Sequence, residues 1–120
     1  MGFFKRLFGI EVKPGEPVSL PNNVDFNEAI NSGTPSLVYF FHLWCSSCQV
    51  MDGLLNEIGP EYLDRINFYK VDVHKVPDAA TAHKISGVPT QIIFSGGVPV
   101  ARHTGLMPID QLKDWIEAQL

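Results

Sequence analysis

The sequence predicts an α/β protein with one central mixed sheet and helices on both faces. Short apolar, β-rich runs alternate with amphipathic stretches, and the resulting order of elements is βαβαβαββα. Strands that are joined through helices are expected to be parallel. Ser-Gly-Gly at 95–97 separates the last two strands, so these are expected to form an antiparallel hairpin.

The chain is expected to begin its fold with an edge strand, a helix and a buried strand. The edge strand covers 17–20, where a proline is tolerated because an edge position needs no backbone donor. The helix runs over 23–32, and either Asn22 or Asn23 can cap its first turn. The apolar, aromatic run at 37–41 then predicts a strand in the middle of the sheet.

The second helix is expected to begin near Ser46. Gly53 and the pair Gly59-Pro60 are expected to bend or interrupt it. Its apolar residues recur at helical spacing and predict a face that packs on the sheet. They are Met51, Leu54, Leu55, Ile58 and Tyr62.

The remaining elements are two helices and three strands. Residues 66–73 predict a strand, 78–84 a short helix, and 90–94 with 98–104 the hairpin. Pro108 is suited to open the last helix. The apolar stripe of that helix consists of Ile109, Leu112, Trp115, Ile116 and Leu120.

Size and composition limit the classes of protein that this chain fits. The 120 residues predict one domain, 14–120, after a basic, Phe-rich extension and linker at 1–13. A net charge of −4 argues against nucleic acid as a partner. Two cysteines are too few for a disulfide-stapled scaffold, and no apolar run reaches the roughly 20 residues that span a bilayer.

The N-terminal extension leaves two interpretations open. Residues 1–10 lack the long apolar stretch and cleavage site of a signal peptide. They are either a start without a function or a short amphipathic segment in weak contact with a membrane or a partner. The residues that favour contact are Phe3, Phe4, Leu7 and Phe8, with Lys5 and Arg6.

Cys45 and Cys48 are the chain's two cysteines, and their spacing is Cys-x-x-Cys. They lie where the predicted strand at 37–41 gives way to a helix. A helix N-terminus favours negative charge through its unpaired N–H groups and its dipole. The thiolate is the reactive form of cysteine, so this position predicts a redox-active nucleophile with a second thiol one turn away.

Together with the rest of its motifs, the chain resembles the thioredoxin family. The resemblance extends from about residue 14 to residue 120, and it rests on a whole pattern of motifs in a βαβαβαββα frame. These motifs are Trp44-Cys45-x-x-Cys48, Lys70-Val71-Asp72, the segment Ile85-Ser86-Gly87-Val88-Pro89-Thr90, Phe94 with Gly97, and Gly105.

The resemblance implies a function for individual residues. Cys45 is the attacking thiol and Cys48 the buried resolving thiol. Pro89 occupies the place of a cis-proline beside the disulfide, which leaves the Val88 backbone free to pair with an extended substrate segment.

Three further residues are implied at the substrate-binding surface. Trp44 covers one side of the site, although its side chain can equally serve packing. Gly87 and Gly105 permit close approach of the substrate backbone.

The chain also departs from the family's pattern. Tyr39 stands where many members have a buried acid that handles the proton of the resolving cysteine, while the usual partner lysine is present as Lys70. A neutral tyrosine is a poor proton acceptor near neutral pH, which predicts slow resolution there. Tyr39 as a core residue and Lys70 as a lysine that extends to solvent are the structural alternatives.

His42 and a metal site are further alternatives. His42 is either a histidine with ordinary hydrogen bonds or a cation that favours the Cys45 thiolate. A zinc site built on the two cysteines and His42 needs a fourth ligand, and no other histidine has a recognised spacing. We therefore expect no metal and no bound cofactor.

The sequence thus predicts a thiol–disulfide oxidoreductase that reduces protein disulfides through a dithiol/disulfide cycle. Its expected partners are protein disulfides and a thioredoxin reductase or another thiol electron donor. It is expected to be a cytoplasmic monomer, either free or peripheral at the inner face of the membrane. The alternatives are a dedicated or oxidising thioredoxin-like partner protein, and a redox-inactive interaction module with the same fold.

Overall fold

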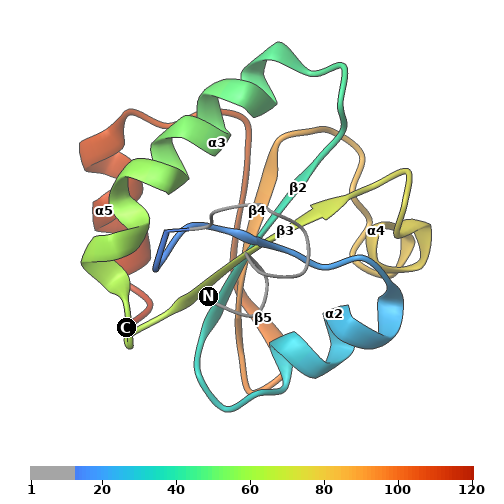
Figure 1. The fold of residues 1–120 in the computed structure, drawn as a ribbon, viewed down its shortest axis with the longest axis horizontal. Coiled ribbons are helices and arrows are strands. Elements are labelled where there is room, and N and C mark those ends of the chain that lie inside the picture. The colour runs from blue at the N-terminus through green and yellow to red at the C-terminus, as the bar shows by residue number, and fades with distance from the viewer. Residues whose placement is uncertain (1–12) are drawn as a thin grey trace.

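Strand β2 (Ser36–Phe41) is the central strand of the sheet, and five of its six residues are accordingly buried. The computed structural model describes residues 13–120, and β2 lies at the middle of a five-stranded sheet in the order β1-β3-β2-β4-β5 (Figure 1). The predictions for residues 1–10 lie outside the described residues. The predicted α/β class and the order of elements are confirmed.

The sheet is mixed, as expected. Strands β1 (Val18–Ser19) and β2 pair in parallel with β3 (Asn67–Asp72). Strand β4 (Thr90–Ser95) is antiparallel to β2, and β5 (Val98–Thr104) is antiparallel to β4. A shift in the β4–β5 register lies between Ile93 and Phe94. The hairpin therefore adds the antiparallel half of the sheet.

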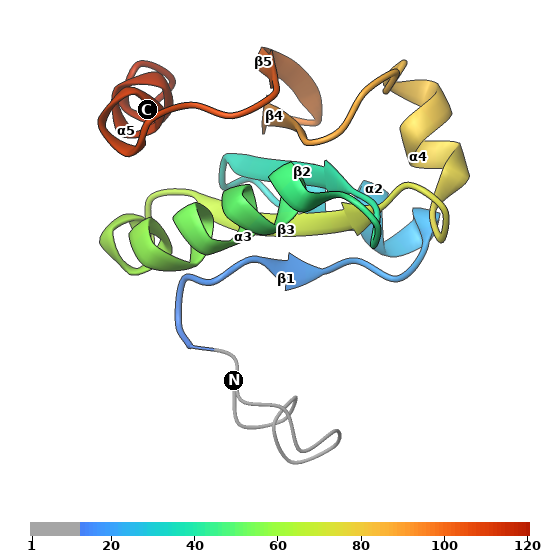
Figure 2. The same cartoon turned by 90° about the horizontal axis from the view of Figure 1, so that it is seen from above.

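The helices cover both faces of the sheet. Helices α2 (Asn23–Ile30) and α4 (Pro77–Ala82) lie on one face, and α3 (Ser46–Ile58) and α5 (Ile109–Glu117) lie on the other (Figures 1 and 2). Alternate residues of β2 supply both cores, since successive side chains of a strand point to opposite faces. Tyr39 packs in the core with α3 and α5, and Val38 packs in the core with α2 and α4.

Most boundaries lie within one to three residues of the expected ones, and the edge strand and the end of the second helix show the differences that matter. The edge strand has two residues instead of four. Helix α3 runs through Gly53 and ends at Ile58, and the 3-10 helix η1 (Gly59–Tyr62) carries Tyr62 instead. The segment before β1 passes very close to the backbone at Gly59, since a Cβ on Gly15 would lie 2.5 Å from the Gly59 carbonyl carbon. The close backbone contact and Pro60 account for the end of α3 at this place.

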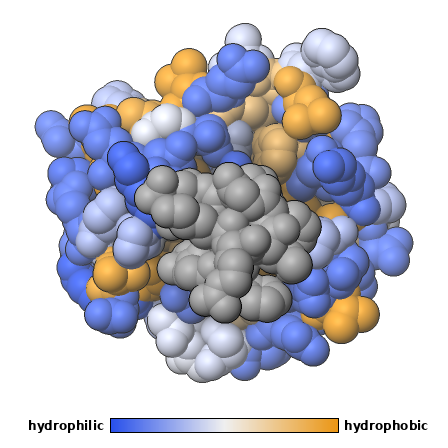
Figure 3. All heavy atoms as spheres, viewed as in Figure 1, coloured by the Kyte–Doolittle hydropathy of each residue, from blue (hydrophilic) through white to orange (hydrophobic). Residues whose placement is uncertain are grey.

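The molecular surface is largely polar on the face that Figure 3 shows, with separate apolar groups between hydrophilic ones. The apolar residues are mostly buried in the two cores between sheet and helices. Within residues 13–120 no helix has both the length and the apolar character needed to cross a bilayer.

Candidate active site

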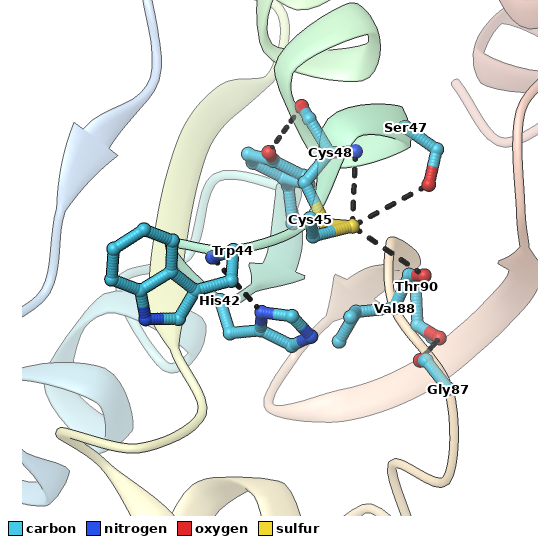
Figure 4. The surroundings of a disulfide bond; sticks show 9 residues. His42, Trp44, Cys45, Ser47, Cys48, Gly87, Val88 and Thr90 are labelled. Atoms are coloured by element: carbon cyan, nitrogen blue, oxygen red, sulfur yellow. Dashed lines mark hydrogen bonds between the residues drawn. A yellow bond between two sulfur atoms is a disulfide. The ribbon is translucent and has the colours of Figure 1, made fainter.

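Cys45 lies at the point where the loop after β2 enters α3, and it is the N-cap residue of that helix. A disulfide joins it to Cys48, with the two Cα atoms 5.1 Å apart (Figure 4). The Cys45 sulfur accepts a hydrogen bond from the Cys48 backbone N–H at 3.1 Å. The Ser47 hydroxyl lies 3.4 Å from the same sulfur and can donate to it. Both donors, with the helix dipole, would stabilise negative charge on Cys45 after reduction.

The two cysteines differ in exposure in the order that the resemblance implied. Cys45 is 8% exposed and Cys48 is 2% exposed. Cys48 lies one turn inside α3, in the core that this helix forms with the sheet and α5. A substrate disulfide therefore has readier access to Cys45 than to Cys48.

The opposite wall of the site is the segment that leads into β4. The Val88–Pro89 peptide bond is cis, in agreement with the resemblance. The Cys45 sulfur lies 3.8 Å from the Val88 carbonyl oxygen (Figure 4). Within residues 13–120 the Val88 backbone makes no hydrogen bond to another backbone group. Its polar groups are therefore available beside the disulfide.

Hydrogen bonds hold this wall in place. The Thr90 hydroxyl donates to the Gly87 carbonyl at 2.5 Å and lies 3.0 Å from the Thr104 hydroxyl. The Gly105 N–H donates to the Pro89 carbonyl at 2.8 Å. Gly105 has a φ of +97°, a conformation that favours glycine, whereas a Cβ on Gly87 would make ordinary contact with Thr104 at 3.6 Å.

Trp44 and His42 lie at the outer rim of the site. The Trp44 side chain is 93% exposed, so it does not serve packing in this conformation, and its indole points away from the disulfide in Figure 4. The Trp44 backbone N–H donates to His42 Nδ1 at 3.2 Å. His42 thus has an ordinary hydrogen bond, and its ring lies 5.6 Å from that of His74.

Tyr39 and Lys70 lie beneath the first two turns of α3. The Tyr39 hydroxyl donates to the Cys48 carbonyl at 2.6 Å. Burial, and then the nearby charge of Asp52, raise the pKa of Tyr39. Lys70 is the register partner of Tyr39, and its Nζ lies 3.6 Å from Asp52 Oδ1. Tyr39 is a buried residue that supports α3, and Lys70 is part of an ion pair.

The described part of the chain contains no cluster of three or more His, Cys, Asp or Glu side chains arranged to hold a metal ion. His83 and His103 do not approach the cysteines closely. His83 packs against Phe26 and Phe94 on the other face of the sheet, and His103 packs against Trp115. The four-ligand zinc alternative has no geometric support in these residues.

Sequence reasoning did not single out Ser47, Thr90 or Asp52 as site residues. For Asp52 a signal was present, since it follows Cys48 by four residues and such residues share one face of a helix. Its ion pair with Lys70 depends on the pairing of β2 with β3, which is not local in sequence.

The fold and the site together define a class of proteins in which a mixed α/β sheet carries a Cys-x-x-Cys disulfide at the N-terminus of a helix. Within that class the chain belongs to the thioredoxin family, whose family model, described as Thioredoxin, matches residues 17–118.

Individual relatives support this assignment. The chain is 35% identical to a thioredoxin of Alicyclobacillus acidocaldarius over 98 residues, which covers 82% of this chain and 90% of the relative. It is 38% identical to thioredoxin Y1, a chloroplastic protein of Arabidopsis thaliana, over 91 residues, or 76% of this chain. That match spans 53% of the plant protein, so the chain spans about half the length of that relative.

A solved structure has the same fold. A mutant thioredoxin from Halobacterium salinarum NRC-1 is similar with a TM-score of 0.79 and 27% sequence identity. The similarity covers 91% of this chain and 95% of the archaeal one.

Proposed function

We propose that this protein reduces disulfides in other proteins through a Cys45–Cys48 dithiol/disulfide cycle. The observation that carries the proposal is the Cys45 sulfur at the N-terminus of α3, disulfide-bonded to Cys48 and hydrogen-bonded by the Cys48 N–H. That arrangement supplies a stabilised thiolate and a second thiol within bonding distance of it.

The reaction proceeds in two exchanges. The Cys45 thiolate attacks one sulfur of a substrate disulfide, forms a mixed disulfide and releases the other substrate sulfur as a thiolate. Cys48 loses its proton and attacks Cys45, which re-forms the internal disulfide and releases the second substrate thiolate. Each released thiolate takes up a proton. The substrate gains two electrons and the cysteine pair loses two.

The wall formed by residues 87–90 suits an extended substrate segment. The Val88 backbone groups lie beside Cys45 and have no backbone partner among the described residues. A strand-like segment that pairs with Val88 would bring its disulfide to the sulfur of Cys45. Gly87 and Gly105 flank this position, and the exposed Trp44 supplies apolar surface at the rim.

The proposed partners follow from this chemistry. The substrates are proteins with accessible disulfides, and the electron donor is a thioredoxin reductase or another thiol donor that reduces the Cys45–Cys48 disulfide. A monomer in the cytoplasm remains our prediction. The relatives include a bacterial thioredoxin and a chloroplastic one, so they do not fix a compartment for this chain.

Reduction of insulin disulfides tests the proposal. We expect insulin to precipitate faster with catalytic amounts of the protein and dithiothreitol than with dithiothreitol alone. A Cys45→Ser variant should give no acceleration and serves as the control. If the folded wild-type protein fails to accelerate the reaction, the reductase function is wrong and the redox-inactive interaction module is favoured.

A further inference from the structure

A pocket of about 230 Å³ lies between α3 and the end of β2, with one lining residue from β3, and the buried cysteine contributes to its wall. Cys48, Asp52, Tyr39 and Lys70 all contribute to its lining, and His42 lies at its rim. The side chains of Asp52 and Lys70 are 34% and 30% exposed, so the pocket connects the neighbourhood of Cys48 with solvent. The pocket thus places two charged side chains, Asp52 and Lys70, at the edge of the apolar core that contains Cys48.

The inference rests on the proposed function, in which Cys48 resolves the mixed disulfide. This resolution requires a base near Cys48. The thiolate, and not the thiol, is the nucleophile in disulfide exchange. Cys48 is 2% exposed, and burial disfavours the charged form of a thiol. A neighbouring proton acceptor is therefore needed for rapid resolution near neutral pH.

Three of the titratable groups at the pocket are unsuited to accept this proton. The Tyr39 hydroxyl donates to the Cys48 carbonyl, and burial and the charge of Asp52 raise the pKa of Tyr39. His42 Nδ1 accepts the Trp44 N–H, so the neutral ring carries its proton on Nε2 and has no free acceptor. A lysine ammonium such as that of Lys70 has donors only.

Asp52 has the position and the chemistry of a proton acceptor. It follows Cys48 by four residues on α3, and helical side chains lean towards the helix N-terminus, which directs Asp52 back towards Cys48. Lys70 Nζ lies 3.6 Å from Asp52 Oδ1, and Asn56 Nδ2 donates to Asp52 Oδ2 at 3.4 Å. These two contacts hold the carboxylate at the pocket.

We propose that Asp52 accepts the proton of Cys48, through water in this pocket, during resolution of the mixed disulfide. Water carries the proton from the Cys48 sulfur to the Asp52 carboxylate, and the Cys48 thiolate then attacks the Cys45 sulfur. The bond between Cys45 and the substrate breaks as the Cys45–Cys48 bond forms. The leaving substrate thiolate is protonated from solvent, and Asp52 returns its proton to solvent.

The experiment measures the two exchange steps separately in the full-length protein. Reduced wild type, Asp52→Asn and Asp52→Glu are mixed with a disulfide peptide in single-turnover reactions from about pH 6 to about pH 9, a range that brackets the thiol titration. Acid quench and mass spectrometry then count the mixed disulfide and the internal disulfide at each time. Glu57→Gln is the matched control, because Glu57 is an acid on the same helix that does not line the pocket.

We expect Asp52→Asn to slow resolution by roughly 100-fold near pH 7, the lower end of the range for general-base catalysis. The deficit should shrink as the pH rises and the thiol ionises without assistance. The rate of mixed-disulfide formation on Cys45 should stay within about twofold of wild type, since Asp52 acts only in the resolution of the mixed disulfide. Asp52→Glu should recover part of the rate, and Glu57→Gln should match wild type.

Three results would overturn the proposal. One is an Asp52→Asn resolution rate equal to that of wild type at all pH values. Another is an equal loss at every pH, which would indicate a structural effect of the substitution. The third is an Asp52→Glu variant that folds and shows the same pH profile as Asp52→Asn. Failure of the proposed function itself is distinguishable, because wild type would then form neither the mixed disulfide nor the internal disulfide, and the peptide would stay oxidised.

Discussion

The Cys45 and Cys48 side chains differ in their surroundings, and this difference gives each a separate part in the proposed cycle. Cys45 is at the helix start beside Val88, whereas Cys48 is buried one turn further along α3. A Cys48→Ser variant should therefore retain attack and lose resolution. We expect it to capture a disulfide protein such as insulin as a stable mixed disulfide, visible on non-reducing gels.

The control for this trapping experiment is Cys45→Ser. It lacks the attacking thiol and should capture no insulin, although it keeps Cys48. Equal capture by the two variants would show that either cysteine can attack, and the assignment of the two thiols would be wrong.

The Tyr39 hydroxyl connects β2 to the first turn of α3 through its hydrogen bond to the Cys48 carbonyl. A Tyr39→Phe variant should lower the free energy of unfolding by about 1 kcal/mol, the typical net value of one hydrogen bond. Urea denaturation of the oxidised protein measures this change. Because we assign proton transfer to Asp52, resolution of the mixed disulfide should keep its wild-type pH dependence. A stability equal to wild type would show that this hydrogen bond contributes nothing.

At the residue scale, sequence reasoning was strongest where one motif carries the chemistry. The Cys-x-x-Cys spacing located the cysteine pair, and the resemblance to the thioredoxin family implied the cis peptide bond at Pro89. The sequence did not predict a role for Asp52, because its ion pair with Lys70 depends on the pairing of β3 with β2. Lys70 is distant from Asp52 in sequence.

Strand β4 contains a buried polar side chain without a partner. Gln91 is fully buried opposite Tyr39 in the β2–β4 pairing, and neither its side-chain nitrogen nor its oxygen has a hydrogen-bond partner among residues 13–120. Burial of unsatisfied polar atoms costs about 1–3 kcal/mol. A Gln91→Met variant should therefore raise the free energy of unfolding by up to about that amount in urea denaturation.

The matched control for Gln91 is Gln111→Met on the exposed side of α5. It makes the same chemical change without burial and should leave stability nearly unchanged. Destabilisation by Gln91→Met alone would contradict the prediction and would show that the Gln91 amide is satisfied in solution.

His83 should make the α2–α4 side of the molecule sensitive to acid. It packs edge-on against Phe26 and Phe94, and burial, followed by the charge of Arg102, lowers its pKa. The unfolded state then binds a proton more readily than the folded state. The contribution of neutral His83 to stability is present above its unfolded pKa of about 6.5 and is lost as the pH falls through the lower folded pKa.

Melting temperatures between about pH 8 and about pH 5 measure this effect across the histidine titration. His83→Gln should remove part of the wild-type loss of stability below about pH 6.5, even if packing losses lower the melting temperature at every pH. His74→Gln is the control, because His74 is exposed. Parallel curves for wild type and His83→Gln would show that His83 does not contribute.

At the element scale, sequence patterns located the strands and α-helices of residues 13–120, but they missed the 3-10 helix η1 and some boundaries. The apolar spacing that placed Tyr62 on the second helix continues past Ile58, although the backbone changes to a 3-10 helix there. The Gly59-Pro60 pair predicted an interruption of the helix at this place, and the structure adds the close approach of Gly15 to Gly59, a contact between segments far apart in the chain. Local sequence patterns carry no information on that second contact.

For the whole molecule, the described fold begins close to the predicted domain boundary at residue 14. Lys13 forms a turn with Glu16, and the Gly15 backbone packs on Gly59. A protein without residues 1–12 should therefore keep its melting temperature within a few degrees, and it should still reduce insulin. A large loss of stability would show that residues 1–12 are part of the folded unit.

The same truncated protein distinguishes the two interpretations of residues 1–10. If this segment contacts membranes, the full-length chain should bind weakly to anionic vesicles through Phe3, Phe4, Leu7 and Phe8 with Lys5 and Arg6. Co-sedimentation with vesicles of phosphatidylserine and phosphatidylcholine should be weakened by the truncation and by high salt. Identical sedimentation of both proteins would dismiss the contact.

The two edge strands of the sheet, β1 and β5, determine whether a strand of another chain can add to the sheet. Strand β1 has only two residues, and β5 carries Pro99 and is paired across a register shift. Short strands, prolines and bulges make poor templates for the addition of another strand. The sheet therefore offers poor sites for strand addition at its margins. We expect an extended segment of a substrate to pair with the Val88 backbone beside the disulfide instead, so that binding and disulfide exchange occur at one place.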